Sequence, residues 1–586
     1  MTHPPPHDSS GACPPPFWIA PGSPTRASFA LLKKLRLQPD TPARAGLAVL
    51  GGLLTAAAFP KFGVAGFAWV APGILLAAGI GADGQRAFRF GYLAGMAHYL
   101  VSLSWLLHIP VIKIAPISAW LALSGYLSLY PALWVWLSWR TYPAPIRQEQ
   151  AQGEGGFLPL FDQFLAAGWG PRAVWALSSA ALWVAWEMGQ ARIISGFPWN
   201  LLGASQYRMV PLIQVASLAG VYGVSFLAVW FAVSGLCAVA MVLRRSEQSR
   251  RWLGELALPL LAVTAVVWVG LRQTVQPLSS TPPASLRVAL VQPSIPQQWI
   301  WSPAERARRF DQLLELSAQA MTNHPDLLVW PEAAAPGYVR WETNVYQPIT
   351  NLVRSWHTWL ILGGDDYVLK GDPKDPEAVD EFNSAFLVDP QGGFRATYRK
   401  RRLVIFGEFL PFHRWLPFLE RWTGMGSFTP GREAVPFVIA EKKMRTFVLI
   451  CFEDVFPHLT REYVDDDTDF LLNLTNNGWF GESAAQWQHA ASAVFRAVEN
   501  GVPLVRCANN GLTCFVDVHG RIWEEYFPGT TDIYGVGIKL VTVPLLDGKK
   551  RAPTFYRRYG DLFGWSCVAW SVLVAGRSLL RRRGDC

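Results

Sequence analysis

Three segments of the chain carry side chains that could do chemistry together. One apolar run ends in the carboxylate of Glu332, a basic run contains Lys400, and a second apolar run ends in the thiol of Cys451. A thiol is a weak nucleophile until it loses its proton, which a nearby carboxylate can accept as general base. A lysine ammonium stabilises a thiolate and the oxyanion of a tetrahedral intermediate. The three residue types together therefore predict acyl transfer through a thioester.

Short apolar runs should hold two of these groups at strand ends. Glu332 and Cys451 each close such a run, and ligands of open α/β sheets bind beyond the carboxyl ends of strands. Strands are predicted at Arg287–Val291, Leu327–Trp330, Leu360–Leu362, Ser384–Val388, Thr446–Ile450, Phe470–Leu474 and Cys514–Val518, and a helix at Trp487–Asn500. This alternation predicts an α/β domain over residues 286–545, and about 260 residues are enough for an independent core.

Each candidate also has a purely structural interpretation. Cysteine is among the most buried residue types, so Cys451 could simply be part of a core. Glu332 could cap a helix, and Lys400 in its basic run could belong to a solvated face. Glu408 and Glu453 could be ordinary ion-pair partners. The order and the local contexts of the residues, rather than any one of them, favour the catalytic interpretation.

Other reaction classes lack their motifs. The chain has no Walker loop, no G-x-S-x-G elbow, no H-E-x-x-H pair and no dinucleotide fingerprint. Its seven cysteines form no C-x-x-C pair and its ten histidines are dispersed, so neither a disulfide framework nor a metal site is expected. No cofactor is predicted.

The composition is that of a membrane protein. Hydrophobic residues make up 51% of the 586 and charged residues only 16%, against ~25% charged in ordinary globular proteins. A membrane-spanning helix needs ~20 mostly apolar residues. About eight segments qualify, near Ala45–Phe59, Val64–Ile80, Phe90–Leu107, Ile117–Trp139, Ala173–Gln190, Ile213–Leu243, Leu253–Leu271 and Leu562–Leu580.

Basic side chains flank these segments unevenly and so predict their orientation. Alternate flanks are rich in Arg and Lys, as at 33–44, 244–251 and 577–583, and should be cytoplasmic. Seven spans, an odd number, precede the α/β domain, which is therefore expected on the opposite side. The net charge of +9 follows from this bias, and nucleic acid is not predicted as a partner. The expected division is a Pro-rich disordered cytoplasmic tail (1–43), a transmembrane bundle (44–272), the α/β domain (286–545) and a final transmembrane helix (561–580).

These residues resemble a known family. Glu332, Lys400 and Cys451 occur in the order and contexts of the triad of the carbon–nitrogen hydrolase (nitrilase) superfamily. Eight apparent spans around such a domain are similar to the apolipoprotein N-acyltransferases of the bacterial inner membrane. Further matches are Gly196–Trp199, Val291–Pro296, Asn383–Ala385, Phe406–Glu408, Asn476–Gly481, Trp487–His489 and Asn509–Gly511.

The resemblance implies a fold and a reaction. The fold would be a multi-pass α-helical membrane bundle of about eight spans carrying an α/β nitrilase-like αββα sandwich, with the catalytic domain periplasmic and both termini cytoplasmic. A phospholipid such as phosphatidylethanolamine would donate an acyl chain to the thiol. The N-terminal amine of a diacylglyceryl-cysteine apolipoprotein would then accept it.

The resemblance also implies residue roles. Cys451 would be the nucleophile, Glu332 the general base and Lys400 the stabiliser of the oxyanion, together with the backbone N–H of Phe452. Supporting roles would belong to Glu408, which orients the lysine, and to Glu453 beside the nucleophile. Trp301 and Trp479 match aromatic positions near the pocket entrance, and their alternative is core or interface packing. Three positions depart from the family pattern: Phe452 replaces a frequent Tyr, Ile405 a common Pro and Asn477 a frequent Asp.

Three other functions compete with acyl transfer between lipids. A membrane-anchored amidase or nitrilase would use the same triad and pass the acyl group to water. A non-catalytic scaffold would be favoured by loss of a triad residue, yet all three are present. A transporter would be favoured by charged residues at the centres of the spans, where none stands apart from Glu187, near the end of one.

Overall fold

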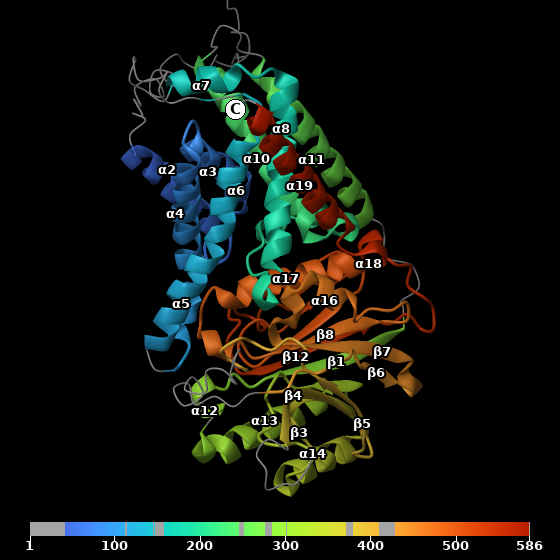
Figure 1. Cartoon of the computed structure of the whole chain (residues 1–586). Coiled ribbons are helices and arrows are strands. Elements are labelled where there is room, and N and C mark those ends of the chain that lie inside the picture. Colours follow the sequence, from blue (N-terminus) through green and yellow to red (C-terminus); the bar gives the residue numbers. More distant parts are fainter. Residues whose placement is uncertain are drawn as a thin grey trace, which may run out of the picture.

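Helices gather at one end of the molecule and an α/β domain lies at the other (Figure 1). The computed structural model describes residues 41–111, 114–144, 146, 158–244, 251–275, 284–300, 302–370, 379–409 and 428–584. The predicted tail, apart from its last three residues, and the candidate Trp301 lie outside the described residues.

Each of the eight apolar segments contains helix. The helices are α2 (Thr41–Ala57), α3 (Ala71–Gly79), α4 (Gly84–Ser102), α5 (Ile114–Leu127), α6 (Leu129–Arg140), α7 (Leu158–Leu165), α8 (Trp169–Gln190), α9 (Val210–Ile213), α10 (Ala216–Arg244), α11 (Trp252–Thr274) and α19 (Leu562–Gly584). Short 3₁₀ turns join some of them, among them η1 (Ala65–Trp69), η2 (Ser104–His108) and η5 (Leu202–Gln206).

Fewer helices than predicted meet the length and composition of a membrane span. Within the described residues four do so, at Ile114–Arg140, Val221–Arg244, Trp252–Thr274 and Leu562–Leu580. The expected second span is divided into η1 and the nine-residue α3, which has a proline, Pro72, in its first turn. A helical bundle with apolar spans is thus confirmed, whereas the count of about eight is not.

Glycines let three helices of the bundle pack closely. A methyl group on Gly52 of α2 would overlap the carbonyl oxygen of Ala94 on α4. On the same α4, Gly91 and Gly95 face α6, where a methyl group on either would lie within 2.7 Å of Pro131 or its neighbours. Small residues at such crossings are typical of helices that pack within membranes, because they let the backbones approach.

In its described residues, the α/β domain consists of two six-stranded sheets. One sheet has the order β12-β1-β2-β3-β4-β5 and the other β11-β10-β9-β8-β7-β6. The first is built from β1 (Ser285–Gln292), β2 (Leu327–Val329), β3 (Trp359–Leu369), β4 (Val379–Val388), β5 (Phe394–Arg399) and β12 (Gly537–Pro544). The second is built from β6 (Pro436–Ile439), β7 (Met444–Ile450), β8 (Phe470–Thr475), β9 (Leu504–Ala508), β10 (Cys514–Val516) and β11 (Ile522–Trp523).

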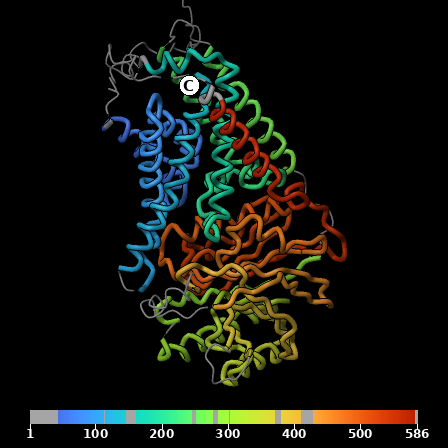
Figure 2. Tube along the Cα trace, in the orientation of Figure 1, coloured from blue at the N-terminus to red at the C-terminus, as the bar shows by residue number. Residues whose placement is uncertain are grey.

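Helices cover the outer faces of the two sheets. In Figure 1, α13 (Arg306–Met321) and α14 (Thr343–Trp356) lie outside the first sheet, and α16 (Pro457–Arg461) and α17 (Ala485–Asn500) outside the second. The predicted α/β sandwich with nitrilase-like αββα layers is therefore present. Figure 2 traces β12 back beside β1, and the two strands pair antiparallel over eight residues.

All seven predicted strands exist, and five further strands went unpredicted. The missed strands are β5, β6, β9, β11 and β12, and β10 ends at Val516 rather than at 518. Strand β12 alternates exposed and buried residues from Lys539 onward, and β9 contains the fully buried Arg506. Polar or charged residues within a strand weaken the apolar pattern on which the predictions rested.

Helix α17 lies between the second sheet and the bundle (Figure 1). Near its C-terminus, Glu499 Oε1 accepts a hydrogen bond of 2.8 Å from the backbone N–H of Val221. That amide follows Gly220, whose non-helical φ of 65° interrupts α10. The carboxylate therefore supplies an acceptor at the start of the long apolar helix, where intrahelical acceptors are missing.

A pair of glycine variants on α2 tests the close packing. Gly52→Ala forces a methyl group against the Ala94 carbonyl, whereas Gly46→Ala on the same helix meets no atom within 4 Å. Because overpacking costs about 1–3 kcal/mol, Gly52→Ala should lower the apparent Tm by several degrees in detergent. Gly46→Ala should leave it unchanged or raise it. Equal effects of the two variants would contradict the packing.

Candidate active site

The structure brings the three predicted triad residues together at the contact between the two sheets. Glu332 lies just beyond β2, Lys400 directly follows β5, and Cys451 follows β7 and opens the short turn η10 (Cys451–Val455). Their exposed fractions are 6%, 1% and 8%. A lysine this deeply buried does not belong to a solvated face, so that interpretation of the basic run is wrong for Lys400.

Two carboxylates hold the buried ammonium. Lys400 Nζ donates to Glu332 Oε1 at 3.1 Å and to Glu408 Oε1 at 2.7 Å. Asn383 Nδ2 donates to the same two oxygens, at 2.9 Å each. The second oxygens accept from backbone amides, Glu332 Oε2 from Asn476 and Glu408 Oε2 from Val404. Each carboxylate is thus fixed through both of its oxygens.

The surroundings shift the pKa of the ammonium and of the thiol upward. Burial alone would lower the pKa of Lys400, but the charges of Glu332 and Glu408 outweigh it and hold that pKa well above its usual range. Burial raises the pKa of the Cys451 thiol to about 12; the charge of Glu332 adds to this rise, while Lys400 and a hydrogen bond with Thr475 oppose it. At neutral pH the lysine is therefore charged and the resting thiol is protonated.

The backbone at Cys451 is strained. Cys451 has a φ of 54°, a left-handed conformation that costs a non-glycine residue of order 1–3 kcal/mol. Its carbonyl oxygen accepts a hydrogen bond of 2.9 Å from Asn473 Nδ2 on the neighbouring β8. The next amide, that of Phe452, stands in the first turn of η10, where amides have no acceptor within the helix. An oxyanion formed beside the sulfur could use that N–H.

The Phe452 ring lies beside the lysine. Lys400 Nζ is 5.8 Å from its centroid, within the range of a cation–π contact. This aromatic contact does not need the hydroxyl of the tyrosine that relatives often carry. Phenylalanine in place of tyrosine at position 452 therefore preserves the contact of the ring with Lys400.

Glu453 supports the site without touching the reacting groups. It is fully buried and accepts hydrogen bonds from four donors: Tyr398 Oη (2.9 and 2.8 Å to its two oxygens) and the backbone amides of Ile450, Arg401 and Arg402. The Tyr398 hydroxyl is also 2.6 Å from that of Tyr463. Burial raises the pKa of Glu453, and these donors oppose the rise. The carboxylate thereby joins the nucleophile turn to the segment that carries the lysine.

A second buried network lies behind Cys451 and was not predicted. Asp454 Oδ1 is 2.6 Å from His489 Nε2, and Arg506 Nη1 donates to Asp454 Oδ2 and to Asn473 Oδ1 at 2.9 Å. Arg506 Nη2 lies 2.7 Å from His489 Nδ1. Because a guanidinium only donates, Nδ1 is the acceptor and Nε2–H donates to Asp454. Burial and the charge of Arg506 lower the pKa of His489, so the ring is neutral.

The remaining predicted residues have less defined positions. Trp479 lies in the 3₁₀ turn η11 (Asn477–Phe480) and is half-buried. Asn477, where relatives often carry Asp, is fully buried and its Oδ1 lies 3.1 Å from His489 Nδ1. Sequence reasoning gave no role to Asn383 or to the Asp454 network. The sequence did contain one signal for the Asp454 network, namely a charged residue, Arg506, inside the apolar run that forms β9.

Comparison with known proteins identifies both parts of the chain. Residues 287–544 match the family model of carbon-nitrogen hydrolases, and residues 51–234 match that of the apolipoprotein N-acyltransferase N-terminal domain. A solved structure, a mutant of the Nesterenkonia AN1 amidase from the nitrilase superfamily, has a TM-score of 0.34 at 19% identity; the match covers 46% of this chain and 95% of that one.

Similarity to curated relatives extends over nearly the whole length. The apolipoprotein N-acyltransferase of Geobacter metallireducens is 35% identical over 543 residues, which cover 92% of this chain and 95% of the relative. That of Vibrio cholerae is 31% identical over 548 residues, covering 91% and 96%. The chain therefore belongs to the apolipoprotein N-acyltransferase family.

Proposed function

We propose that the protein transfers an acyl chain from a phospholipid to the N-terminal amine of diacylglyceryl-cysteine apolipoproteins, through a thioester on Cys451. The observation that carries the proposal is the buried Glu332–Lys400 pair, coupled to the thiol of Cys451, in a domain that packs on apolar helices. Relatives named apolipoprotein N-acyltransferase support an apolipoprotein as the acyl acceptor.

The first half-reaction loads the enzyme. Glu332 takes the thiol proton, and the Cys451 sulfur attacks the ester carbonyl of the phospholipid. Lys400 and the Phe452 N–H stabilise the oxyanion. When the intermediate collapses, the ester C–O bond breaks, the proton on Glu332 passes to the leaving oxygen, and a lysophospholipid departs from the thioester.

The second half-reaction unloads it. The amine of the apolipoprotein attacks the thioester carbonyl, and Glu332 takes a proton from the attacking nitrogen. The same two donors stabilise the second oxyanion. The C–S bond breaks, the amide is released, and the proton returns from Glu332 to the sulfur. Water must be kept from the thioester, because hydrolysis would make the enzyme a phospholipase.

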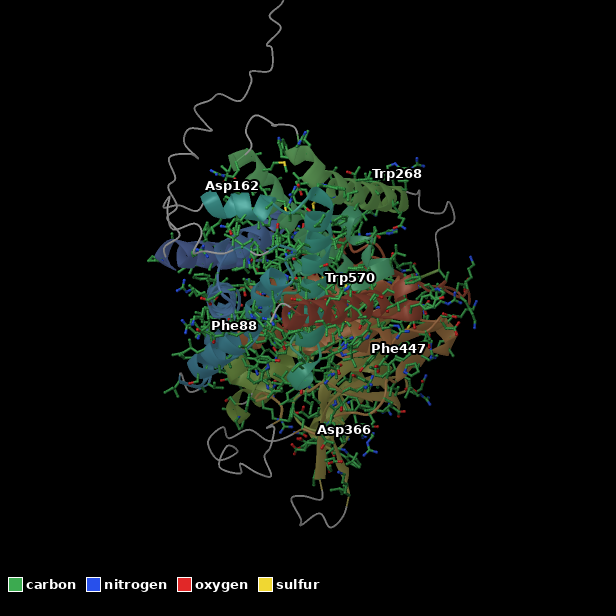
Figure 3. The ribbon with its side chains drawn as sticks, turned by 45° about the horizontal axis from the view of Figure 1, so that its top comes forward. Phe88, Asp162, Trp268, Asp366, Phe447 and Trp570 are labelled. Atoms are coloured by element: carbon green, nitrogen blue, oxygen red, sulfur yellow. The ribbon has the colours of Figure 1, made fainter. Side chains whose placement is uncertain are left out.

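A membrane setting suits lipid substrates. Removing an acyl chain from a bilayer costs ~0.8 kcal/mol for each CH₂ exposed, which an enzyme at the membrane avoids. Figure 3 labels Trp268 of α11 and Trp570 of α19, aromatic side chains of two apolar helices that are 56% and 45% exposed. Exposed tryptophans on such helices are compatible with contact to lipid.

The proposed topology has about eight spans in the bacterial inner membrane. The N- and C-termini would be cytoplasmic and the catalytic domain periplasmic, with the bundle at 44–272 and the last span at 561–580. The uneven basic flanks support this orientation. The C-terminal end of α19 lies at the end of the bundle away from the catalytic domain (Figure 1), as this topology requires.

The competing functions have less support. An amidase that passes the acyl group to water needs no apolar bundle, and the N-terminal match is to acyltransferases. For a transporter, Glu187 is the relevant acid, but its Oε1 already accepts hydrogen bonds from Trp183 Nε1 and the Leu202 N–H. The same-fold hydrolase remains the alternative that an experiment must separate.

Acyl loading and discharge test the proposed function. The full-length protein in mild detergent, given phosphatidylethanolamine, should gain the mass of one acyl chain that hydroxylamine removes. Cys451→Ser should gain none, because it lacks the thiol. A diacylated lipopeptide with a free amine should take the acyl group, as intact mass would record. Release as free fatty acid despite the peptide would favour the hydrolase, and absence of any adduct would contradict both.

The raised thiol pKa predicts an unusual pH profile. Iodoacetamide reacts with the thiolate, and the pKa of Cys451 is about 12. The alkylation rate of the peptide containing Cys451 should therefore still rise at pH 10. The rate of an ordinary thiol would level off above its pKa of ~8.5. Because the Glu332 charge raises that pKa, Glu332→Gln should alkylate faster at a given pH yet load acyl chains ~10²–10⁴-fold more slowly. A wild-type alkylation rate that levels off just above pH ~8.5, as for an ordinary thiol, would argue against this electrostatic arrangement.

A further inference from the structure

One buried side chain of the catalytic domain is bound entirely by the membrane bundle. Gln488 on α17 is 3% exposed and makes five hydrogen bonds. Its Oε1 accepts from Trp105 Nε1 (3.1 Å), Trp199 Nε1 (2.8 Å) and Asn200 Nδ2 (3.3 Å), and its Nε2 donates to the carbonyls of Pro60 (2.6 Å) and Ser102 (3.1 Å). Both ends of the amide are therefore satisfied by partners outside its own domain.

The five partners come from three separate connections of the bundle. Pro60 follows α2, Ser102 ends α4 just before Trp105 in η2, and the other two lie between α8 and η5. Two of these partners also pack together, since the rings of Trp105 and Trp199 are 5.0 Å apart. Gln488 thus sits where three bundle connections converge on α17, and it can hold them in one arrangement.

The next residue along α17 contacts the nucleophile turn. His489 Nε2 bonds to Asp454 Oδ1, three residues after Cys451, at 2.6 Å. Its ring is 5.4 Å from that of Trp199, so the tryptophan that bonds to Gln488 also packs on the histidine. Adjacent residues of one helix therefore connect the bundle with the turn that carries the thiol.

The nucleophile turn depends on such support because it is strained. A non-glycine residue keeps a left-handed conformation like that of Cys451 only where its surroundings enforce it. Here the enforcing contacts are the Asn473 bond to the Cys451 carbonyl and the ring of bonds among Asp454, His489 and Arg506. A shift of α17 would move His489 within that ring.

We propose that Gln488 is a positioning residue, through which docking of the catalytic domain on the membrane bundle holds the Cys451 turn in its reactive geometry. The inference rests on the proposed function for its kinetic readout, but the position of the thiol can be measured without a lipid substrate. It makes the bundle a part of the catalytic apparatus as well as an anchor.

A second interface glutamine provides a matched control. Gln214, beyond α9, is 6% exposed, and its Nε2 donates to the carbonyl of His519 in the catalytic domain at 2.8 Å. It too joins bundle to domain through a buried amide. No hydrogen bond of Gln214 reaches the turn of Cys451 within the described structure; its amide bonds to Val210 and His519.

The experiment compares Gln488→Met with Gln214→Met in the full chain, purified in mild detergent. Methionine keeps the length of glutamine and removes its donors and acceptor. Gln488→Met should load acyl chains from phosphatidylethanolamine at least ~10-fold more slowly in kcat with KM little changed, because small misplacement of a reacting group is costly. Its iodoacetamide profile for Cys451 should move toward that of an ordinary thiol. Gln214→Met should stay within about twofold of wild type in kcat, with an unshifted profile.

A milder change covers the case in which Gln488→Met does not fold. The double variant Trp105→Phe/Trp199→Phe keeps an aromatic ring at both positions and removes two of the three donors to Gln488 Oε1. Its loading rate and alkylation profile should fall between those of the wild type and of Gln488→Met. Where only the double variant folds, it should load more slowly than the wild type and its profile should move toward that of an ordinary thiol.

Two results would overturn the proposal. One is that the Gln488 and tryptophan variants load acyl chains and are alkylated like the wild type. The other is that Gln214→Met changes both measurements as much as Gln488→Met does. Failure of the wild-type protein to load any acyl chain would instead refute the proposed function. The alkylation profiles would still decide whether Gln488 positions the thiol.

Discussion

The structure depends on keeping one ammonium charged inside a protein core. An isolated ion at this depth would lose more solvation than the protein could replace, so it needs partners of opposite charge. Lys400 has two, Glu332 and Glu408, and both are fixed by Asn383. The carboxylates come from different parts of the chain. The ends of strands β2, β4 and β5 must therefore meet in one sheet before the ammonium can be buried, and the sheet order β2-β3-β4-β5 brings them together.

Cys451, the proposed nucleophile, reaches this cluster from the other sheet, and buried polar groups fix its position. Glu453 joins the turn of Cys451 to the amides that follow Lys400. On the opposite side, Asp454, His489 and Arg506 connect the same turn to α17. The consecutive residues Glu453 and Asp454 thus face different layers. Glu453 faces the partner sheet, and Asp454 faces α17, the helix that packs on the bundle. Removing either would leave buried donors unpaired, which costs more than the bonds themselves contribute.

The sequence predicted the reactive groups better than their supports. Glu332 and Cys451 close apolar strands, and that pattern is local, so their positions followed from it. Lys400 could be placed only through the resemblance, because a basic run by itself indicates a solvent-exposed face. Asn383 bonds two carboxylates that lie 51 residues before it and 25 residues after it. Contacts of this kind depend on strand order, which local periodicity does not contain. The span count is not confirmed for a related reason, since a proline in the first turn of α3 stands in a segment whose apolar composition suggested a full helix.

In the proposed mechanism, the charge of the cluster lets the chemistry proceed where lipid chains replace water. Glu332, Glu408 and Lys400 sum to one negative charge while the thiol is neutral. Moving the thiol proton to Glu332 shifts that charge from the carboxylate to the sulfur and leaves the total unchanged. No ion has to enter or leave, and in a low dielectric an uncompensated ion is the costly event. The ammonium stays beside the charge in both states, and Glu408 keeps it in place when Glu332 is protonated. The same arrangement suits the proposed second half-reaction, because the negative charge that forms on the departing sulfur is again within reach of Lys400.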